Sequence, residues 1–205
     1  MHRVTHLVLI ALLVLALGGC GAPKPVNYYA VQMPPAPAPA ASAYPIDLLV
    51  GRVSAPTLLE TTPIVYRTGS NQLGTYQYHR WADPPVQMVQ TKLVRLLRDS
   101  GQYRSVSGLG NPSDAQFVVR GRLSELAEVD AAESISGLVT MEFELYNRKT
   151  AKILWSHAYS QVEPVPTTKD VSAVVGALDR NLDRGLKEVV AGIGKYFAAN
   201  PPATN

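Results

Sequence analysis

Cys20 is the residue whose type and position point most directly to chemistry, because it is the only cysteine in a chain of 205 residues. Arg3 precedes an almost unbroken run of Leu, Val, Ile and Ala over residues 8–17, and two glycines separate this run from the cysteine. A positive start, an apolar core and small residues before a cleavage point are the three parts of a secretory signal peptide. The sequence therefore predicts that residues 1–19 are removed.

The residues at this junction, Leu17-Gly18-Gly19-Cys20, resemble the lipobox that bacterial lipoprotein signal peptidase recognises. The resemblance implies that Cys20 receives a diacylglyceryl thioether, becomes the mature N-terminus and is then N-acylated, with palmitate as a typical chain. An ordinary signal peptide with a chance cysteine is one alternative, and a transmembrane anchor is another. An anchor needs about 20 apolar residues to cross a bilayer, and this run has only about twelve.

A lipidated Cys20 would hold the protein on a membrane, because one acyl chain binds marginally whereas two or more bind stably. Gly21 stands where an aspartate would favour inner-membrane retention, so the resemblance implies the bacterial outer membrane, with the domain facing the periplasm. Residues 20–26 form a short polar tether that reaches only about 25 Å when extended. We therefore expect the folded domain to lie close to the bilayer.

Outside the lipobox, no residue pattern indicates catalysis or binding of a cofactor or metal. Only His79 and His157 remain in the mature chain, and the motifs of serine hydrolases, zinc proteases and phosphate-binding loops are missing. The net charge of +3 includes an arginine of the signal peptide, and no basic cluster indicates a nucleic-acid partner. Asp47 is the one carboxylate within an apolar strand pattern, and we expect a polar edge or Arg52 to satisfy it. The sequence therefore predicts a protein that is not an enzyme.

About 185 residues remain after the signal peptide, which is the length of one ordinary domain. Runs of β-branched and aromatic residues bounded by turn residues predict strands, at residues 27–32, 46–53, 64–67, 73–81, 116–126, 138–146 and 153–162, with residues 103–106 as an optional short strand. We predict a single α+β domain over residues 27–199 with a mixed or antiparallel sheet of about six to seven strands and two amphipathic helices. Residues 200–205 are expected to form a loose tail.

The two helices are expected at residues 84–99 and 169–198, where apolar residues recur at three- and four-residue spacing. Asp83 is the expected N-cap of the first helix, and Thr167 with Asp170 resembles a capping box at the second. The solvent face of the second helix is expected to carry Asp179, Arg180, Asp183, Arg184, Lys187 and Glu188. Its glycines are expected to permit close helix approach or to kink the helix: Gly176, Gly185, Gly192 and Gly194.

Two of the predicted strands alternate clearly between apolar and polar residues, which indicates a sheet with one buried and one solvated face. If these strands pair, Arg120 and Arg122 should face Glu142 and Glu144 on the solvated side. Cross-strand ion pairs of this kind are worth about a few tenths of a kcal/mol and help to set the register. We therefore expect these residues to fix strand pairing before they bind anything.

The segment at residues 34–45 is rich in proline and alanine, a composition that favours extended polyproline II conformation and acts as a semi-rigid spacer. It is either a variable loop between the first two strands or an arm that docks a partner.

Several segments together resemble the ABC-type transport auxiliary lipoproteins. They are a Tyr-Tyr strand after the lipobox, Ile64-Val65-Tyr66-Arg67, and Arg80-Trp81-Ala82-Asp83-Pro84-Pro85 at the start of a helix, with a later hairpin over residues 143–155 and a closing helix. The family's usual tryptophan segment reads Trp-Ala-Glu-Pro-Leu or similar, and Asp83 and Pro85 replace its Glu and Leu here. The resemblance covers nearly the whole mature chain and implies a compact α/β domain.

Members of this family include the lipoprotein of the paraquat-inducible intermembrane transport system. They are encoded beside an ABC permease, an ATPase and a mammalian-cell-entry (MCE) domain protein that spans the periplasm. The resemblance implies an outer-membrane subunit that docks the MCE protein in a lipid transport system, with homo-oligomers conceivable. The alternatives are another outer-membrane lipoprotein adaptor, such as a cell-wall-synthase activator or a secretion-pore component, and a periplasmic hydrolase. Tyr78 and Trp81 are the expected partner contacts, although Trp81 also fits a core position at the helix start.

Overall fold

A computed structural model describes residues 23–33, 44–69, 71–110, 114–131, 134–166 and 170–202. The signal peptide, the lipobox with Cys20, Thr167 and nearly all of the Pro/Ala-rich segment lie outside these residues. The elements along the described chain are β1 (Asn27–Tyr29), β2 (Tyr44–Ser54), the 3₁₀ helix η1 (Thr57–Glu60), β3 (Pro63–Thr68), β4 (Gln72–Trp81), α2 (Pro85–Asp99), β5 (Tyr103–Gly108), β6 (Phe117–Ala131), β7 (Ser134–Asn147), β8 (Lys152–Val165) and α3 (Val171–Ala199).

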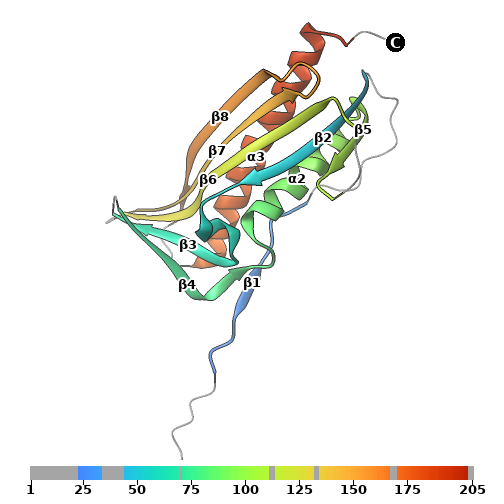
Figure 1. Cartoon of the computed structure of the whole chain (residues 1–205). Helices are drawn as coiled ribbons and strands as arrows, with labels where there is room; N and C mark the ends of the chain where they lie inside the picture. Colours follow the sequence, from blue (N-terminus) through green and yellow to red (C-terminus); the bar gives the residue numbers. More distant parts are fainter. Residues whose placement is uncertain are drawn as a thin grey trace, which may run out of the picture.

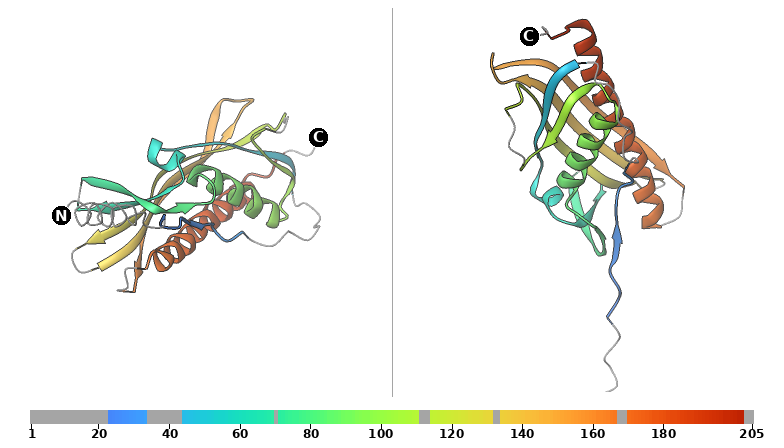
Figure 2. Two further views of the ribbon diagram at one scale, coloured as in Figure 1. Left: turned by 90° about the horizontal axis from the view of Figure 1, so that it is seen from below. Right: turned by 90° about the vertical axis from the view of Figure 1, so that its right-hand side faces the viewer.

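The eight strands of the described chain form one mixed sheet, and α2 and α3 lie on one of its faces (Figures 1 and 2). This confirms the predicted α+β class, with a slightly larger sheet than expected. Strand β6 organises the sheet, because one of its edges pairs antiparallel with β7 and the other pairs in parallel with β2 and, further along, with β3. Strand β2 then pairs with β5, β3 with β4, β4 with β1, and β7 with β8.

Strand β7 shows why the alternating pattern was informative. Its inward side chains, Val139, Met141, Phe143 and Leu145, are at most 2% exposed. On the opposite face Arg120 of β6 stands across from Glu144, and Arg122 across from Glu142. The Arg120 guanidinium lies 2.5 Å from the Glu144 carboxylate, and it also covers the Tyr146 ring. The predicted cross-strand pairing is confirmed.

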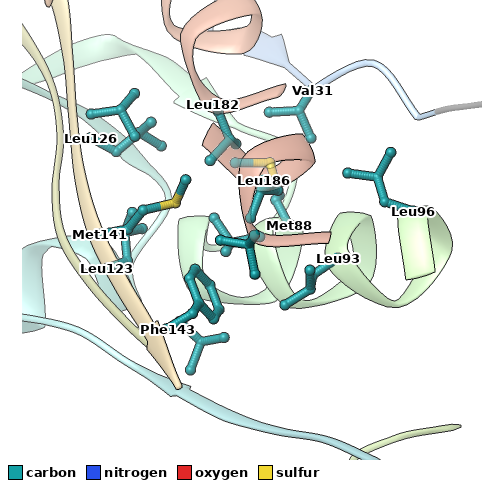
Figure 3. Packing of buried hydrophobic residues seen from close by; sticks show 14 of the residues in the cluster. Val31, Met88, Leu93, Leu96, Leu123, Leu126, Met141, Phe143, Leu182 and Leu186 are labelled. Carbon is teal, nitrogen blue, oxygen red and sulfur yellow. The ribbon is translucent and has the colours of Figure 1, made fainter. Parts of the chain in front are cut away.

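The core lies between the inner face of the sheet and the two helices. Figure 3 shows Met88 and Leu93 of α2 and Leu182 and Leu186 of α3 directed toward side chains of the sheet. Their sheet partners in this view include Leu123, Leu126, Met141 and Phe143. Each fully buried side chain of this size contributes about 1.5–3 kcal/mol through the area that it removes from water, so this layer accounts for the position of both helices.

Two glycines of α3 allow the helix to approach the sheet closely, as the sequence predicted. A Cβ atom on Gly185 would lie 2.3 Å from the methyl group of Met141, and one on Gly192 would lie 2.3 Å from the Trp155 ring. Real Cβ atoms do not approach so closely, so any larger residue would push the helix away. The helix α3 continues through both positions from Val171 to Ala199.

The starts of both helices differ from the predicted caps. Pro84 occupies the N-cap position of α2 and makes no side-chain cap hydrogen bond, so the expected cap by Asp83 is wrong. A proline in the first turn of a helix has no backbone N–H, so one donor fewer needs a capping acceptor. At α3, Asp170 is itself the N-cap, and its Oδ1 accepts a hydrogen bond from the Ser172 amide at 2.9 Å.

A buried asparagine fixes α3 on the last two strands. Asn181 is fully buried, and its Nδ2 donates to the carbonyl oxygens of Gly137 and Gln161 at 3.0 and 2.7 Å. Its Oδ1 accepts a hydrogen bond from the Tyr159 hydroxyl at 2.6 Å. Both the nitrogen and the oxygen of the Asn181 side-chain amide are hydrogen-bonded. These bonds, together with apolar packing, fix the position of α3 along β7 and β8.

Candidate functional site

The chain enters the domain at the far edge of the sheet, beside β4. Strand β1 pairs in parallel with β4, with Tyr28 opposite Arg80 and Tyr29 opposite Trp81. The Tyr29 hydroxyl lies 2.9 Å from Nδ1 of His79, and the two rings stack. The edge strand β1 therefore joins whatever precedes it directly to the sheet.

The segment after β1 is held by a buried group of charges between α2 and α3. The Gln32 amide donates to Oδ1 of Asp179 at 3.1 Å, and the same oxygen lies 3.1 Å from Nζ of Lys92. Lys92 is only 1% exposed and also lies 3.2 Å from Asp183, which in turn binds Lys187 at 2.7 Å. We call Lys92, Asp179 and the partly buried Asp183 the buried charge cluster, to which the backbone amide of the exposed Gln32 is bonded. It connects the entering chain to both helices.

The protonation of Asp183 depends on this cluster. Burial by itself would favour the neutral acid, but the hydrogen bonds from Lys187 and Lys92 outweigh it and lower the pKa of Asp183 below its usual value. A carboxylate that is stabilised in this way adds stability above its unfolded pKa of about 3.9 and loses it as the pH falls through the folded pKa.

The two residues predicted to contact a partner occupy different environments. Trp81 is 0% exposed and belongs to the core, so its side chain has the core role that the sequence left open and is not available to a partner in this structure. Tyr78 is half-buried on β4, and the Lys24 ammonium lies 5.3 Å from the centre of its ring. Of the pair, only Tyr78 remains a predicted contact.

A second buried carboxylate lies beneath an aromatic group on the inner side of β3, β4 and β6. Glu128 is 4% exposed and accepts a hydrogen bond from the Tyr76 hydroxyl at 2.8 Å. Burial raises the pKa of Glu128, although the bond from Tyr76 opposes the shift. The rings of Tyr66 and His79 pack edge-on against Tyr76. This arrangement is packed core with a satisfied acid.

The outer face of the sheet, which the helices leave uncovered, contains an open hollow of about 580 Å³. Its charged lining residues are Arg52, Arg120, Arg122, Glu142 and Glu144. Arg52 is extended into solvent, with its side chain 80% exposed and Glu60 as far as 3.9 Å away. The hollow therefore offers polar groups of both signs to a partner, but no shielded acid–base pair of the kind that catalysis needs.

Asp47 is satisfied by residues of the edge strand β5 and not by Arg52, which was the other expected partner. Nε of Arg104 donates to its Oδ1 at 3.0 Å, and the Ser105 hydroxyl donates to the same oxygen at 2.6 Å. The hydrogen bond from Arg104, with help from Ser105, lowers the pKa of Asp47 below its usual value. The expected partner Arg52 is wrong, because parallel pairing of β2 with β5 places Asp47 opposite Ser105.

Sequence reasoning missed the buried charge cluster and placed Asp179 on the solvent face of its helix. Asp179 is 9% exposed and lies between the helices instead. A signal was available, since Lys92 follows the buried Met88 by four residues and so shares its side of α2. Within the described residues no group of His, Cys, Asp and Glu could hold a metal ion, and no helix is long and apolar enough to cross a membrane.

Comparison with solved structures first defines the class of fold. The crystal structure of protein XCC0632 from Xanthomonas campestris matches with a TM-score of 0.74 and 20% identity, over 85% of this chain and 98% of that one. A structure of an uncharacterised protein matches with a TM-score of 0.65 and 15% identity, over 83% of this chain and 99% of that one. At these identities the likeness shows a shared α+β fold.

The family follows from the sequence itself. The family model of the ABC-type transport auxiliary lipoprotein component matches residues 29–190, which run from the last residue of β1 through the buried charge cluster to most of α3. The chain therefore belongs to the family of ABC-type transport auxiliary lipoprotein components, as the resemblance indicated. No curated protein matched the chain.

Proposed function

We propose that this protein is a non-enzymatic outer-membrane lipoprotein that serves an MCE-type intermembrane lipid transport system and docks its periplasm-spanning component. The observation that carries the proposal is the family match across residues 29–190. An ABC permease and its ATPase would be indirect partners, reached through the MCE-domain protein. Lipidation of Cys20 would attach the protein to the outer membrane with the domain in the periplasm.

The geometry of the domain supports a docking role. The entering strand β1 lies along β4 at one edge of the sheet, so the tether leaves from that edge. The outer face of the sheet carries the charged hollow, and neither described helix covers this face (Figure 2). The buried acids have structural partners, Tyr76 for Glu128 and Lys92 for Asp179. These features fit a subunit that binds a macromolecule and performs no reaction.

A co-purification experiment tests the docking role. The full-length lipoprotein, extracted in mild detergent from cells that co-express the neighbouring MCE-domain protein, should retain that protein on an affinity column. Tyr78→Ala should reduce the retained amount several-fold, because it removes a half-buried aromatic contact from the β4 edge. Tyr196→Ala is the matched control, since Tyr196 is also half-buried but lies near the end of α3. Failure of the unmodified lipoprotein to retain any MCE-domain protein encoded beside it would contradict the proposal.

Intact-mass analysis tests the anchor separately. The mature protein should begin at Cys20 and carry the mass of the acyl chains, and Cys20→Ser should give a folded protein that leaves the membrane fraction. A mature species that begins elsewhere, or that carries no acyl mass, would refute lipidation. The co-purification result is independent of this outcome, because it measures the domain's contacts in detergent.

A further inference from the structure

The chain that enters the domain exposes apolar and cationic side chains at and just before strand β1. Tyr28 is 67% exposed, more than any other large apolar side chain of the described residues, and Val26 is 38% exposed. Lys24 is exposed as well, and its ammonium lies 5.3 Å from the centre of the Tyr78 ring. We call Lys24, Val26 and Tyr28 the tether patch.

The neighbouring Tyr29 shows in which direction Tyr28 points. The Tyr29 ring stacks on His79, and its hydroxyl lies 2.9 Å from Nδ1 of that residue. Since successive side chains of a strand point to opposite faces, Tyr28 points away from this packed pair of rings. Val26 lies two residues earlier, at the spacing that places side chains on one side of an extended chain. The apolar groups of the tether patch are thus open to solvent in the described chain.

The tether patch lies among residues that carry positive but no negative side chains. Residues 23–33 contain Lys24 and no Asp or Glu, and β4, whose Arg80 stands opposite Tyr28, has no acidic residue either. Tyrosine is enriched at membrane–water interfaces, where its ring is partly buried and its hydroxyl stays in water. Lysine covers apolar groups with its stem and keeps its ammonium in water. This composition fits the surface of a bilayer that contains anionic phospholipids.

The distance from the proposed anchor keeps this patch close to the bilayer. Lys24 follows Cys20 by four residues and Tyr28 follows it by eight, so they lie within about 14 and 29 Å of it even when the chain is fully extended. Strand β1 also lies at the end of the domain from which the tether leaves (Figures 1 and 2). The part of the domain that comes nearest to the headgroups is therefore the part that carries the exposed tyrosine.

We propose that the tether patch contacts the phospholipid surface of the same membrane leaflet that holds Cys20. Tyr28 and Val26 enter the boundary between headgroups and acyl chains, and Lys24 lies beside anionic phosphates. The inference rests on the proposed lipidation of Cys20 and is independent of the proposed MCE partner. The contact gives the domain a defined orientation, with the edge formed by β1 and β4 toward the bilayer and the last turns of α3 away from it (Figure 1).

The tether patch is too small to hold the protein on a membrane by itself. It has two apolar side chains and one lysine, so Cys20→Ser protein should not stay bound to vesicles. Once Cys20 is anchored, contact of the patch with lipid becomes an intramolecular event, at an effective concentration that the short tether sets. The acyl chains therefore supply the attachment, and the patch supplies the orientation.

Quenching of tryptophan fluorescence by brominated phospholipids tests the contact. The full-length lipoprotein, once its acyl mass is confirmed, is reconstituted into vesicles of phosphatidylethanolamine and phosphatidylglycerol that carry bromine on acyl carbons near the headgroup. Tyr28→Trp should be quenched clearly more than the wild type, because the added indole lies at the lipid boundary. Adding Lys24→Glu should reduce this excess quenching several-fold, since it sets a negative charge against the anionic headgroups.

Ile153→Trp is the matched control for the position of the indole. Ile153 is 57% exposed and lies two residues before Trp155, which packs at Gly192. The entering chain is bonded to Asp179, which precedes Gly192 by about 20 Å along α3. Ile153→Trp should therefore show no quenching beyond the wild type. Lys152→Glu, an exposed charge change at the same far end, is the control for Lys24→Glu and should leave the quenching of Tyr28→Trp unchanged.

The proposal is overturned if Tyr28→Trp in the acylated protein is quenched no more than the wild type, or no more than Ile153→Trp. Tyr28→Ser should leave the amount of MCE-domain protein retained in detergent unchanged, and a clear loss would assign the patch to a protein partner instead. A protein without acyl mass would overturn the anchor and this inference together. Failure to retain any MCE-domain protein would contradict the proposed function alone, with the quenching of Tyr28→Trp still expected.

Discussion

Lys92→Ala should lower the free energy of unfolding by about 3–5 kcal/mol, which is the usual result of removing one partner from a buried ion pair. The side chain is 1% exposed and is the cation between Asp179 and Asp183. Its loss would leave Asp179 as a buried carboxylate without its cation, and would weaken the bond through which Asp179 holds the Gln32 amide. Urea unfolding followed by circular dichroism measures the change.

Lys187→Ala is the matched control for this prediction. Lys187 binds the other side of Asp183, but its side chain is 64% exposed, so its removal should cost at most about 1 kcal/mol. The difference in unfolding free energy between the wild type and Lys92→Ala should shrink as the pH falls below about 4, because protonation of Asp183, whose pKa the lysines lower, removes its part of the stabilisation that Lys92 provides. Equal losses for the two variants, or a difference independent of pH, would contradict a buried charge cluster.

Trp81→Ala should lower the free energy of unfolding by about 3–5 kcal/mol, because truncating a buried tryptophan leaves a large cavity. Trp81 is fully buried where β4 ends and α2 begins, and its amide donates to the Thr62 carbonyl at 2.7 Å. The melting temperature of the purified variant should fall correspondingly. Trp81→Phe retains most of the volume and should lose clearly less.

The neighbouring Tyr78 provides the contrast. Tyr78→Ala should lower the melting temperature clearly less than Trp81→Ala does, since its half-buried side chain removes less area from water, while it weakens retention of the MCE-domain protein. A variant Trp81→Ala with unchanged stability and lost binding would reverse these roles and would make Trp81 a surface contact.

Local patterns predicted most of the elements of this fold. The alternation of β7 identified its buried residues, and the three- and four-residue spacing identified both helices, because each pattern is a direct consequence of backbone periodicity. The order of the strands was not predictable in this way. The parallel pairing of β6 with both β2 and β3 depends on packing between segments far apart in the chain. The sequence of a short strand such as β1 does not indicate which strand it pairs with.

The functional residues were harder to predict for the same reason. Lys92 and Asp179 are charged residues at helical positions, and such residues are solvent-exposed unless a partner is buried with them. Their burial follows from the crossing of α2 and α3, which neither helix sequence reveals alone. Asp47 was expected to be satisfied at a polar edge or by Arg52 on its own strand, and pairing with β5 supplied Arg104 instead of Arg52. Cys20 could be singled out because its recognition depends on a linear motif.

The parallel pairing of β1 with β4 has a mechanical consequence. Residues 23–26 continue from β1 away from the domain (Figure 1), so a pull on the proposed lipid anchor would act along β1. Such a load shears the hydrogen bonds to β4 together and does not open them one after another. The bond from Gln32 to Asp179 lies directly behind them. Tension from the bilayer would thus be transmitted through Gln32 and Asp179 into the two packed helices.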